Sequence, residues 1–543
     1  MNHSLKSLLY QDLNSRRLDD LEKAKRRWAK TLKRVVKNSE VLNVYESLVQ
    51  EGKIKSSSAL QNLLKIRRVR TLSGVAPMAI MMKPFACPGE CIYCPQEPGM
   101  PKSYLSSEPA AARAKKLNFD PQKQLLARLK QLEATGHKPE KLQIIVIGGT
   151  FSAYPDNYKK EFLKAVFDAA NGQVAPTMEK AQAANETAKY RIVGVSVETR
   201  PDWVTDQEIK LWRAYGVTKI QLGVQALDDK INHLTQRGHD VAAVARATQK
   251  LRDHGFKINY HWMPNLPGAN PKKDMAMFRT LFADARFRPD TLKIYPCVVI
   301  PHTQLHSLWQ QDKYKPYDEP TLIQVLVKMK QLVPSYCRID RLVRDIPKQW
   351  IAAGTIHTNM RQIVKAKMKE QKLKCLCIRC REVKDQSQPH AGVKLRTLTY
   401  QAHGGQEIFL SFEDKNYLYA LLRLRLPSKN QKPLFSVLKN AALIREVQVF
   451  GPQLPLSSTS EVNTSSNLGK SYSQHQSLGK KLLAAAEKLA KKKGYQKMAI
   501  IAGVGVRNYY RKLGYHLQQT YMVKSLSLPT REDLPALDPL LEG

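Results

Sequence analysis

The segment Cys87-Pro-Gly-Glu-Cys91-Ile-Tyr-Cys94 places three thiols within eight residues, ahead of the βα units that the sequence predicts downstream. Three thiolates can hold three irons of a [4Fe-4S] cluster and leave the fourth iron open to an exogenous ligand. A structural zinc site normally has four protein ligands, and residues 95–114 contain no further Cys or His. We therefore expect an open iron–sulfur cluster here, with a structural zinc site as the alternative.

Downstream of these cysteines, short β-rich runs alternate with helical patterns as far as about Val299. Thr205 followed by Glu208 forms a capping box that opens a helix reaching Tyr215, and Gly216 stops it. Strands alternating with helices indicate a parallel sheet, so we expect a full or partial βα barrel that binds ligands at the C-terminal ends of its strands. The expected strands are residues 142–147, 192–197, 219–224, 257–263 and 291–295.

The remainder of the chain has a different pattern. Residues 393–400, 407–413, 417–426 and 443–450 read as antiparallel strands and are followed by one long helix, which indicates an α+β domain. Between the last of these strands and the helix, residues 452–474 are rich in Ser, Thr and Asn and predict a loop.

Composition and charge restrict the class of protein. With 543 residues, 43% of them hydrophobic, the chain is too long for one core and too apolar for dominant disorder. The net charge of +41 favours a polyanionic partner. Residues 1–75 hold 17 basic and 7 acidic residues in a helical pattern, which predicts either a phosphate-binding extension or a solvated helical face. We find no membrane span or signal peptide and expect a cytoplasmic protein.

A second cysteine group, Cys375-Leu-Cys377-Ile-Arg-Cys380, lies on a basic segment after the expected barrel. Three sulfur atoms at this spacing predict a structural zinc knot between two domains, and three unligated thiols on a turn are the alternative. The spacing does not decide the fourth zinc ligand, for which the candidates are Cys337, His357, His390 and His403.

The segment from Gln474 to Lys480 runs into a helical pattern and resembles the pyrophosphate loop of GNAT acetyltransferases, Q/R-x-x-G-x-G/A. Gln474 and Gly479 match its first and last positions, while Ser477 replaces the middle glycine. Backbone N–H groups at such a helix start can receive phosphate oxygens. Residues 510–515 resemble the Y-x-K-x-G-Y segment of these domains, whose first tyrosine lies beside the thioester. Core packing of Tyr509 and Tyr510 is the alternative.

Taken together, these features resemble the Elongator catalytic subunit family, whose members are tRNA uridine carboxymethyltransferases with a radical S-adenosylmethionine (SAM) domain and a GNAT domain. Four further motifs carry the resemblance: Val197-Glu-Thr-Arg-Pro-Asp202, Gln221-Leu-Gly-Val-Gln225, Arg344-Asp-Ile-Pro347 and Arg507-Asn-Tyr-Tyr510. We therefore divide the chain into a basic helical tRNA-binding extension (1–75), a radical SAM βα barrel (76–335), a linker with the zinc cysteines (336–390), a GNAT-type acetyl-CoA domain (391–530) and a tail (531–543).

The resemblance also implies roles for particular residues. Cys87, Cys91 and Cys94 would bind the [4Fe-4S] cluster, and Gly148, Gly149, Thr150 and Glu198 would line the SAM pocket. Tyr509 and Tyr510 would be catalytic. The residues expected to contact acetyl-CoA are Lys141, Glu446, Val447, Gln448, Val449, Leu478, Gly479, Lys480 and Tyr510. Because Lys141 belongs to the radical domain, acetyl-CoA would bridge both domains.

The implied reaction attaches a carboxymethyl group at C5 of the wobble uridine, uridine 34 of tRNA. A 5'-deoxyadenosyl radical from SAM would remove hydrogen from the acetyl methyl group, and the carbon radical would add to the base, giving 5-carboxymethyluridine after thioester hydrolysis and re-oxidation. The partners would be a tRNA anticodon stem-loop, an electron donor, and further copies or companion subunits, with no membrane. The alternatives are a protein lysine N-acetyltransferase with a structural radical domain and a non-catalytic tRNA-binding scaffold.

Overall fold

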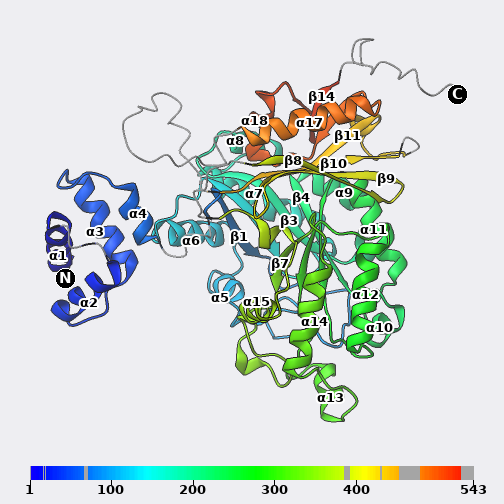
Figure 1. Ribbon diagram of the computed structural model, residues 1–543, viewed down its shortest axis with the longest axis horizontal. Helices are drawn as coiled ribbons and strands as arrows, with labels where there is room; N and C mark the ends of the chain where they lie inside the picture. The colour runs from blue at the N-terminus through cyan, green and yellow to red at the C-terminus, as the bar shows by residue number, and fades with distance from the viewer. Residues whose placement is uncertain are drawn as a thin grey trace.

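The computed structural model describes residues 2–15, 18, 20–65, 71–384, 392–428, 431–451 and 477–526. These residues form a small helical bundle, a parallel sheet covered by helices, and a mixed sheet that packs against the parallel one (Figure 1). Three regions for which the sequence made predictions lie outside the described residues: His390, the 452–474 loop, which ends at Gln474, and the 531–543 tail.

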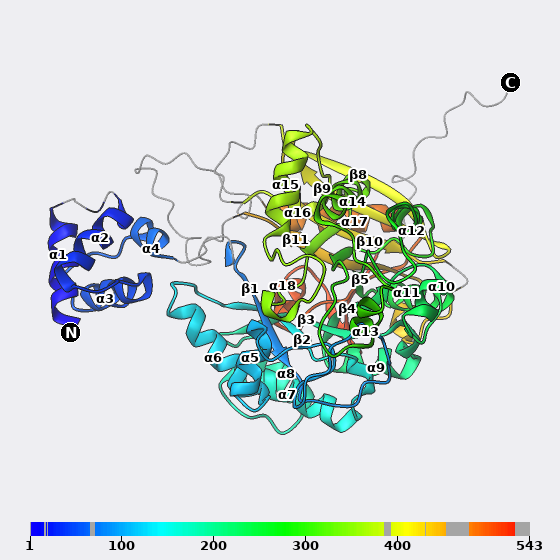
Figure 2. The same cartoon turned by 90° about the horizontal axis from the view of Figure 1, so that it is seen from below.

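The N-terminal residues form a bundle with its own hydrophobic core, in which Trp28, Val41 and Tyr45 are buried. Asp20 caps the second helix by accepting from the backbone N–H of Glu22, at 3.0 Å. In Figures 1 and 2 the bundle lies to one side of the two sheets. Its helices are α1 (Asn2–Asn14), α2 (Leu21–Leu32), α3 (Asn38–Gln50) and α4 (Ser58–Leu64).

The central sheet has seven parallel strands in the order β1-β2-β3-β4-β5-β6-β7, which is an open half barrel. The five strands expected from the sequence are confirmed as β2 to β6. The bounds are β1 (Val75–Met81), β2 (Lys141–Ile147), β3 (Arg191–Thr199), β4 (Val217–Gln225), β5 (Lys257–Trp262), β6 (Thr291–Ile294) and β7 (Arg338–Leu342). Strand β7 lies beyond residue 335, where the sequence placed the end of this domain, so that boundary was set too early.

Helices cover the outer face of the half barrel, and side-chain caps fix where they begin. The predicted capping at Thr205 is confirmed, because its hydroxyl accepts from the backbone N–H of Glu208 at 3.2 Å. The helices are α5 (Pro109–Lys116), α6 (Pro121–Glu133), α7 (Asp156–Asn171), α8 (Met178–Asn185), α9 (Asp206–Ala214), α10 (Asp229–Leu234), α11 (Val241–Asp253), α12 (Pro271–Ala283), α13 (Gln304–Gln310), α14 (Glu319–Leu332), α15 (Met360–Glu370) and α16 (Ile378–Arg381).

The second sheet is mixed, in the order β13-β14-β12-β11-β10-β9-β8, as expected for an α+β domain. Helix α17 (Leu478–Lys492) precedes β12, and β12 pairs parallel to β11. The short helices η8 (Val504–Val506) and α18 (Arg507–Arg511) follow β12. The strands are β8 (Lys394–Ala402), β9 (Gly405–Glu413), β10 (Leu418–Leu426), β11 (Ala441–Val449), β12 (Lys497–Ile500), β13 (His516–Gln518) and β14 (Tyr521–Ser525).

One continuous hydrophobic core runs through both sheets. The contact is closest where η8 meets the start of β3: a Cβ added at Gly503 would lie 2.1 Å from the carbonyl oxygen of Val193. At Gly505 an added Cβ would lie 2.6 Å from Cβ of Arg191. These two glycines let the mixed sheet pack directly on the backbone of the half barrel. Among the described residues, no helix combines the length and the apolar character that crossing a bilayer needs.

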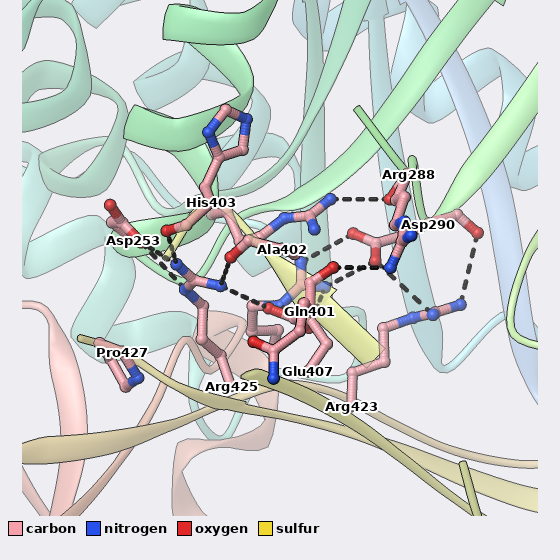
Figure 3. A network of polar contacts seen from close by, with 12 residues as sticks. Asp253, Arg288, Asp290, Gln401, Ala402, His403, Glu407, Arg423, Arg425 and Pro427 are labelled. Carbon is pink, nitrogen blue, oxygen red and sulfur yellow. Dashed lines mark hydrogen bonds and ion pairs between the residues drawn. The ribbon is translucent and has the colours of Figure 1, made fainter. Parts of the chain in front are cut away.

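Buried ion pairs also join the two sheets (Figure 3). Arg445 of β11 contacts Asp290, which precedes β6, at 2.6 Å, and Glu407 of β9 at 2.8 Å. Arg423 of β10 lies 3.6 Å from Asp290, and Arg425 of β10 pairs with Asp253 of helix α11. Buried charges are tolerated only when they are paired in this way, so these contacts fix how one sheet sits on the other.

Candidate active site

The three N-terminal cysteines lie in the loop that follows β1. Backbone hydrogen bonds from Ile92 N to Thr235 O (3.2 Å) and from Leu305 N to Ile92 O (2.9 Å) pin this loop across the half barrel. The Arg237 guanidinium donates to Sγ of Cys91 at 3.2 Å and to the carbonyl oxygen of Gly223. A hydrogen bond from Cys94, opposed by burial and helped by the charge of Arg237, lowers the pKa of Cys91 to about 4.

The surroundings of these cysteines fit a [4Fe-4S] cluster and SAM. A thiolate at Cys91 is the form that ligates iron, and Arg237 supplies a positive charge beside it. The buried hydroxyl of Tyr93 lies beside Cys91 and Cys94 and is an orphaned polar atom among the described residues, which a ligand bound there could satisfy. Sγ of Cys87 lies 4.0 Å from Oγ1 of Thr150, which brings the cysteine loop to the residues after β2.

Two of the predicted SAM residues, Gly148 and Gly149, need to be glycines. They adopt φ values of +133° and +97°, which side-chain-bearing residues rarely take. A Cβ at Gly148 would also lie 3.2 Å from Cβ of Met82. The chain therefore turns sharply at the C-terminal end of β2 and presents its backbone beside Thr150 and the cysteine loop.

Glu198, the fourth predicted SAM residue, lies on β3 and faces the concave side of the sheet. Its carboxylate accepts from Tyr104 OH at 2.8 Å and from Nζ of Lys293 at 3.2 Å. Lys293 belongs to β6, and strands β3 and β6 are not neighbours, so the two side chains meet across the curved inner face. Glu198 therefore occupies the inner face at the C-terminal end of its strand, where ligands of βα barrels bind.

The inner face carries further polar residues that the sequence interpretation missed. Nζ of Lys219 on β4 lies 2.8 Å from Asp340 on β7, and Asn259 on β5 donates to the same carboxylate at 3.2 Å. His261 lies two residues beyond Asn259 on that face and contacts Gln221. The sequence contained a pattern that predicts these residues, because polar residues recur at every second position in otherwise apolar strands. In β5 this is the series Lys257, Asn259 and His261.

The expected acetyl-CoA residues meet where β11 and β12 separate. β11 pairs with β12 only from Ala441 to Ile444, so among the described residues the backbone from Arg445 to Val449 has no strand partner on that side. A Cβ at Gly479, at the start of α17, would lie 3.3 Å from Tyr509 OH and 3.6 Å from Cγ2 of Val449. The structure thus brings the helix start, the free strand edge and the tyrosine pair together.

The predicted residues of the acetyl-CoA site differ in their exposure and backbone conformation. Tyr509 is 39% exposed, whereas Tyr510 is 7% exposed and packs on Tyr515, with ring centroids 6.1 Å apart. Burial raises the pKa of both tyrosines. Lys480 is exposed and Leu478 is buried. Ser477 has φ +55°, the left-handed region that favours glycine.

Two predicted acetyl-CoA residues, Glu446 and Lys141, lie at or near the interface between the sheets. Glu446 is ion-paired with Lys257 of β5 and with Arg423 at 2.7 Å, so its carboxylate is already occupied. Only its backbone can serve a ligand. Lys141 begins β2 in register with Arg191, the residue against which Gly505 packs. Lys141 therefore lies one strand away from the contact between the two sheets.

The second cysteine group is confirmed as a cluster, because the Sγ atoms of Cys375, Cys377 and Cys380 all lie within 4.8 Å of one another. None of the described candidates for a fourth ligand belongs to this group. His357 pairs with Glu319 at 3.0 Å, and His403 contacts the carbonyl oxygen of Arg286. Lys330 Nζ donates to Cys380 at 3.6 Å. Three close sulfurs suit zinc, with the fourth position left to another donor.

Comparison with known proteins places this architecture in a family. Residues 83–281 match the Radical SAM superfamily model, and residues 289–370 match the Radical_SAM C-terminal domain. A tRNA uridine(34) acetyltransferase of Dehalococcoides mccartyi (strain CBDB1) is 44% identical over 84% of this chain and 99% of its own. The Elongator complex protein 3 of Homo sapiens is 37% identical over 85% of this chain and 86% of its own. The solved structure of the archaeal Methanocaldococcus infernus Elp3 with an N-terminal deletion (1–46) has a TM-score of 0.72 at 37% identity, covering 84% of this chain and 100% of that one. This chain therefore belongs to the radical SAM enzyme family that contains Elongator complex protein 3 and the tRNA uridine(34) acetyltransferases.

Proposed function

We propose that this protein attaches a carboxymethyl group to C5 of the wobble uridine of tRNA, with SAM as the radical source and acetyl-CoA as the carbon donor. Family membership supports the substrate class, because the relatives are named for tRNA uridine 34. The observation that carries the proposal is the rigid contact between the half barrel and the mixed sheet. It holds a radical site and an acetyl-CoA site in one body.

At the radical site the chain binds and orients its ligands. Cys87, Cys91 and Cys94 would hold a [4Fe-4S] cluster, and when bound it supplies the electron that cleaves SAM to a carbon radical. Arg237 stabilises the thiolate at Cys91 through its 3.2 Å contact. The turn at Gly148 and Gly149 presents backbone groups beside the cysteine loop.

At the donor site the chain offers contacts suited to a coenzyme A thioester. The backbone from Arg445 to Val449 can pair with the amides of the pantetheine arm, because no strand of the described part of the chain pairs with that edge beyond Ile444. The start of α17 can receive the pyrophosphate through its N–H groups. Tyr509 OH, close to Gly479, can donate a hydrogen bond to the thioester. This site holds the donor rather than delivering it to an amine.

The charge of the chain supports an RNA substrate. A net charge of +41 repels equally basic protein tails and attracts a polyanion. The N-terminal bundle contributes to this charge and has its own core, so it can present its cations as a rigid surface. We propose that it binds tRNA and that the wobble base turns out of the anticodon loop to reach C5.

The test is an anaerobic reaction of the reconstituted enzyme with reductant, SAM, tRNA and acetyl-CoA labelled on the methyl carbon. Mass spectrometry of the nucleosides should show label in 5-carboxymethyluridine, and Cys91→Ala should abolish it. Cys297→Ala is the matched control, because this buried thiol lies outside both cysteine groups and should leave the product unchanged. Unlabelled tRNA together with acetylated lysines on added protein would instead favour the protein acetyltransferase.

A further inference from the structure

His261 occupies the inner face of the half barrel without a role in binding the cluster. It lies on β5, and Nε2 contacts Oε1 of Gln221 at 3.3 Å. The Gln221 amide donates in turn to Oγ of Ser196 at 2.6 Å, which orients its oxygen toward the histidine. A carbonyl oxygen can only accept, so Nε2 carries the hydrogen and Nδ1 keeps a free lone pair.

The charges around His261 keep its imidazole neutral. Burial, and then the positive charges of Lys293, Lys219, Arg237 and Arg344, hold the pKa of His261 well below its ordinary value. The Glu198 carboxylate opposes this from 4.0 Å. The Tyr295 ring packs edge-on, with ring centroids 5.6 Å apart. The side chain is nevertheless 14% exposed, so solvent reaches it.

Lys293 complements this imidazole with a positive charge. Its ammonium lies 3.2 Å from Oε1 of Glu198, the same oxygen that is 4.0 Å from His261. Burial lowers the pKa of Lys293, but Tyr295 and Glu198 raise it overall, so the ammonium persists. The Nε2–H edge of the neutral imidazole and a fixed cation therefore face one carboxylate oxygen of the proposed SAM pocket, while the lone pair of Nδ1 lies on another edge of the same ring.

Another histidine near the cysteine loop lacks this freedom. His239 has Nδ1 3.3 Å from the carbonyl oxygen of Asp240 and Nε2 3.3 Å from that of Gly223. Burial lowers the pKa of His239 to about 4, so the neutral ring donates from one nitrogen only, and a carbonyl oxygen lies beside the other. His261 differs because Nε2 is held, whereas Nδ1 has no hydrogen-bond partner among the described residues.

The proposed reaction needs a hydrolysis at this point of the molecule. Hydrogen abstraction requires the acetyl methyl group to reach the SAM pocket, and the thioester carbonyl carbon is bonded directly to that methyl carbon. After the carbon–carbon bond to uridine forms, the thioester linking the base to coenzyme A must still be cleaved by water. When the pantetheine arm carries the acetyl group from the site beside Tyr509 into the SAM pocket, the carbonyl carbon stays one bond from the methyl carbon and so comes beside Glu198 and His261.

We infer that His261 is the general base that hydrolyses this thioester, with Lys293 stabilising the developing oxyanion. The inference rests on the proposed function. Nδ1 takes a proton from water as the water oxygen bonds to the carbonyl carbon. The carbon–sulfur bond then breaks, and the coenzyme A thiolate leaves with the proton returned by the imidazolium. Thioester and water become a carboxylic acid and a thiol, and no oxidant is consumed.

The experiment is a single-turnover reaction of the reconstituted holoenzyme with labelled acetyl-CoA, comparing wild type with His261→Gln. Glutamine can still donate to Gln221 but has no basic nitrogen. We expect wild-type yields of 5'-deoxyadenosine, accumulation of tRNA linked to coenzyme A through a thioester, and hydrolysis slowed about 100-fold or more. Hydrolysis in the variant should become first order in hydroxide, whereas a merely structural role would leave the pH profile unchanged. His516→Asn, on the exposed strand β13, is the matched control.

Several results would overturn the inference. Hydrolysis at the wild-type rate in His261→Gln would refute a base role, and a parallel loss of 5'-deoxyadenosine would show that His261 supports the SAM pocket instead. If that variant does not fold, His261→Gly with added imidazole replaces it. We expect imidazole to restore hydrolysis, and a failure to restore it would contradict the role of His261 as the base. A wild type that labels no uridine refutes the proposed function itself, which the other outcomes leave intact.

Discussion

Replacing Arg445 by leucine should be among the most destabilising changes in the interface between the two sheets. Arg445 is fully buried, and all three of its nitrogens donate. Nε reaches Glu407 at 3.1 Å, Nη1 reaches Phe256 O at 2.8 Å and Asp290 at 2.7 Å, and Nη2 reaches Asp290 at 2.6 Å and Glu407 at 2.8 Å. Leucine would leave two buried carboxylates without their main partner.

The expected loss follows from what those carboxylates retain. Removing one partner of a buried ion pair costs about 3–5 kcal/mol of unfolding free energy. Asp290 keeps the Ile258 N–H at 2.8 Å and Arg423 at 3.6 Å, and Glu407 keeps Arg425 at 3.3 Å. These residual contacts place the expected loss near the lower end of that range, about 3 kcal/mol.

The assay is urea unfolding followed by tryptophan fluorescence, with Arg396→Leu on the exposed strand β8 as the control that should change stability by only about 0.5 kcal/mol. Adding Asp290→Asn and Glu407→Gln to Arg445→Leu should recover part of the loss, because the stranded charges disappear. A loss below about 1 kcal/mol for Arg445→Leu would refute the claim that these ion pairs hold the sheets together.

Three further predictions concern other parts of the molecule. Ser477→Gly should relieve the backbone strain of φ +55° at the start of α17 and raise the free energy of unfolding by about 1 kcal/mol. Calorimetry should also show tighter binding of acetyl-CoA. Weaker binding would mean that the serine hydroxyl contacts the ligand. His254 accepts a hydrogen bond from Leu434 N at 3.2 Å, and its pKa is lowered chiefly by burial, so the unfolded chain binds the proton more tightly than the folded one. The urea midpoint should therefore fall as the pH drops below 6.5. An equally steep fall in His254→Gln would contradict this. Reversing the exposed charges of Arg26, Lys30 and Lys33 to glutamate should weaken tRNA binding and lower its salt slope by about three, whereas unchanged affinity would leave the bundle with a purely structural role.

Local sequence patterns identified most of the half barrel but missed its two edge strands for physical reasons. Pro77 interrupts the apolar run of β1, and proline is tolerated there because β1 pairs only with β2 and lies at the sheet edge. Strand β7 reads Arg-Ile-Asp-Arg-Leu, and its charges are unusual for a strand until they find partners. Asp340 finds one partner two residues away, in Arg338, and another in Lys219 of β4, which the sequence could not show to be close.

Part of the candidate site also follows from local sequence patterns, whereas the rest depends on contacts between residues far apart in the chain. The spacing of Cys87, Cys91 and Cys94 is a local property, so it predicted the cluster site directly. The pairing of Glu198 with Lys293 depends on which strands face one another across the curved sheet, and no short motif encodes that curvature. Glu446 was assigned to acetyl-CoA, yet its side chain serves the contact between the sheets, because neighbouring positions of a strand alternate between faces.

The arrangement bears on how the two proposed ligands, SAM and acetyl-CoA, would react without a large domain closure. A group that passes between two sites needs them at a fixed separation, and misplacement by about 1 Å can cost about 100-fold in rate. Here the mixed sheet is fixed on the half barrel by backbone contact at Gly503, where even a methyl group would overlap Val193. The buried ion pairs of Arg445 fix the same interface from another side. Because charges buried there tolerate no sliding, any flexibility that the proposed reaction needs would come from its ligands, which are the long pantetheine arm and the extruded base.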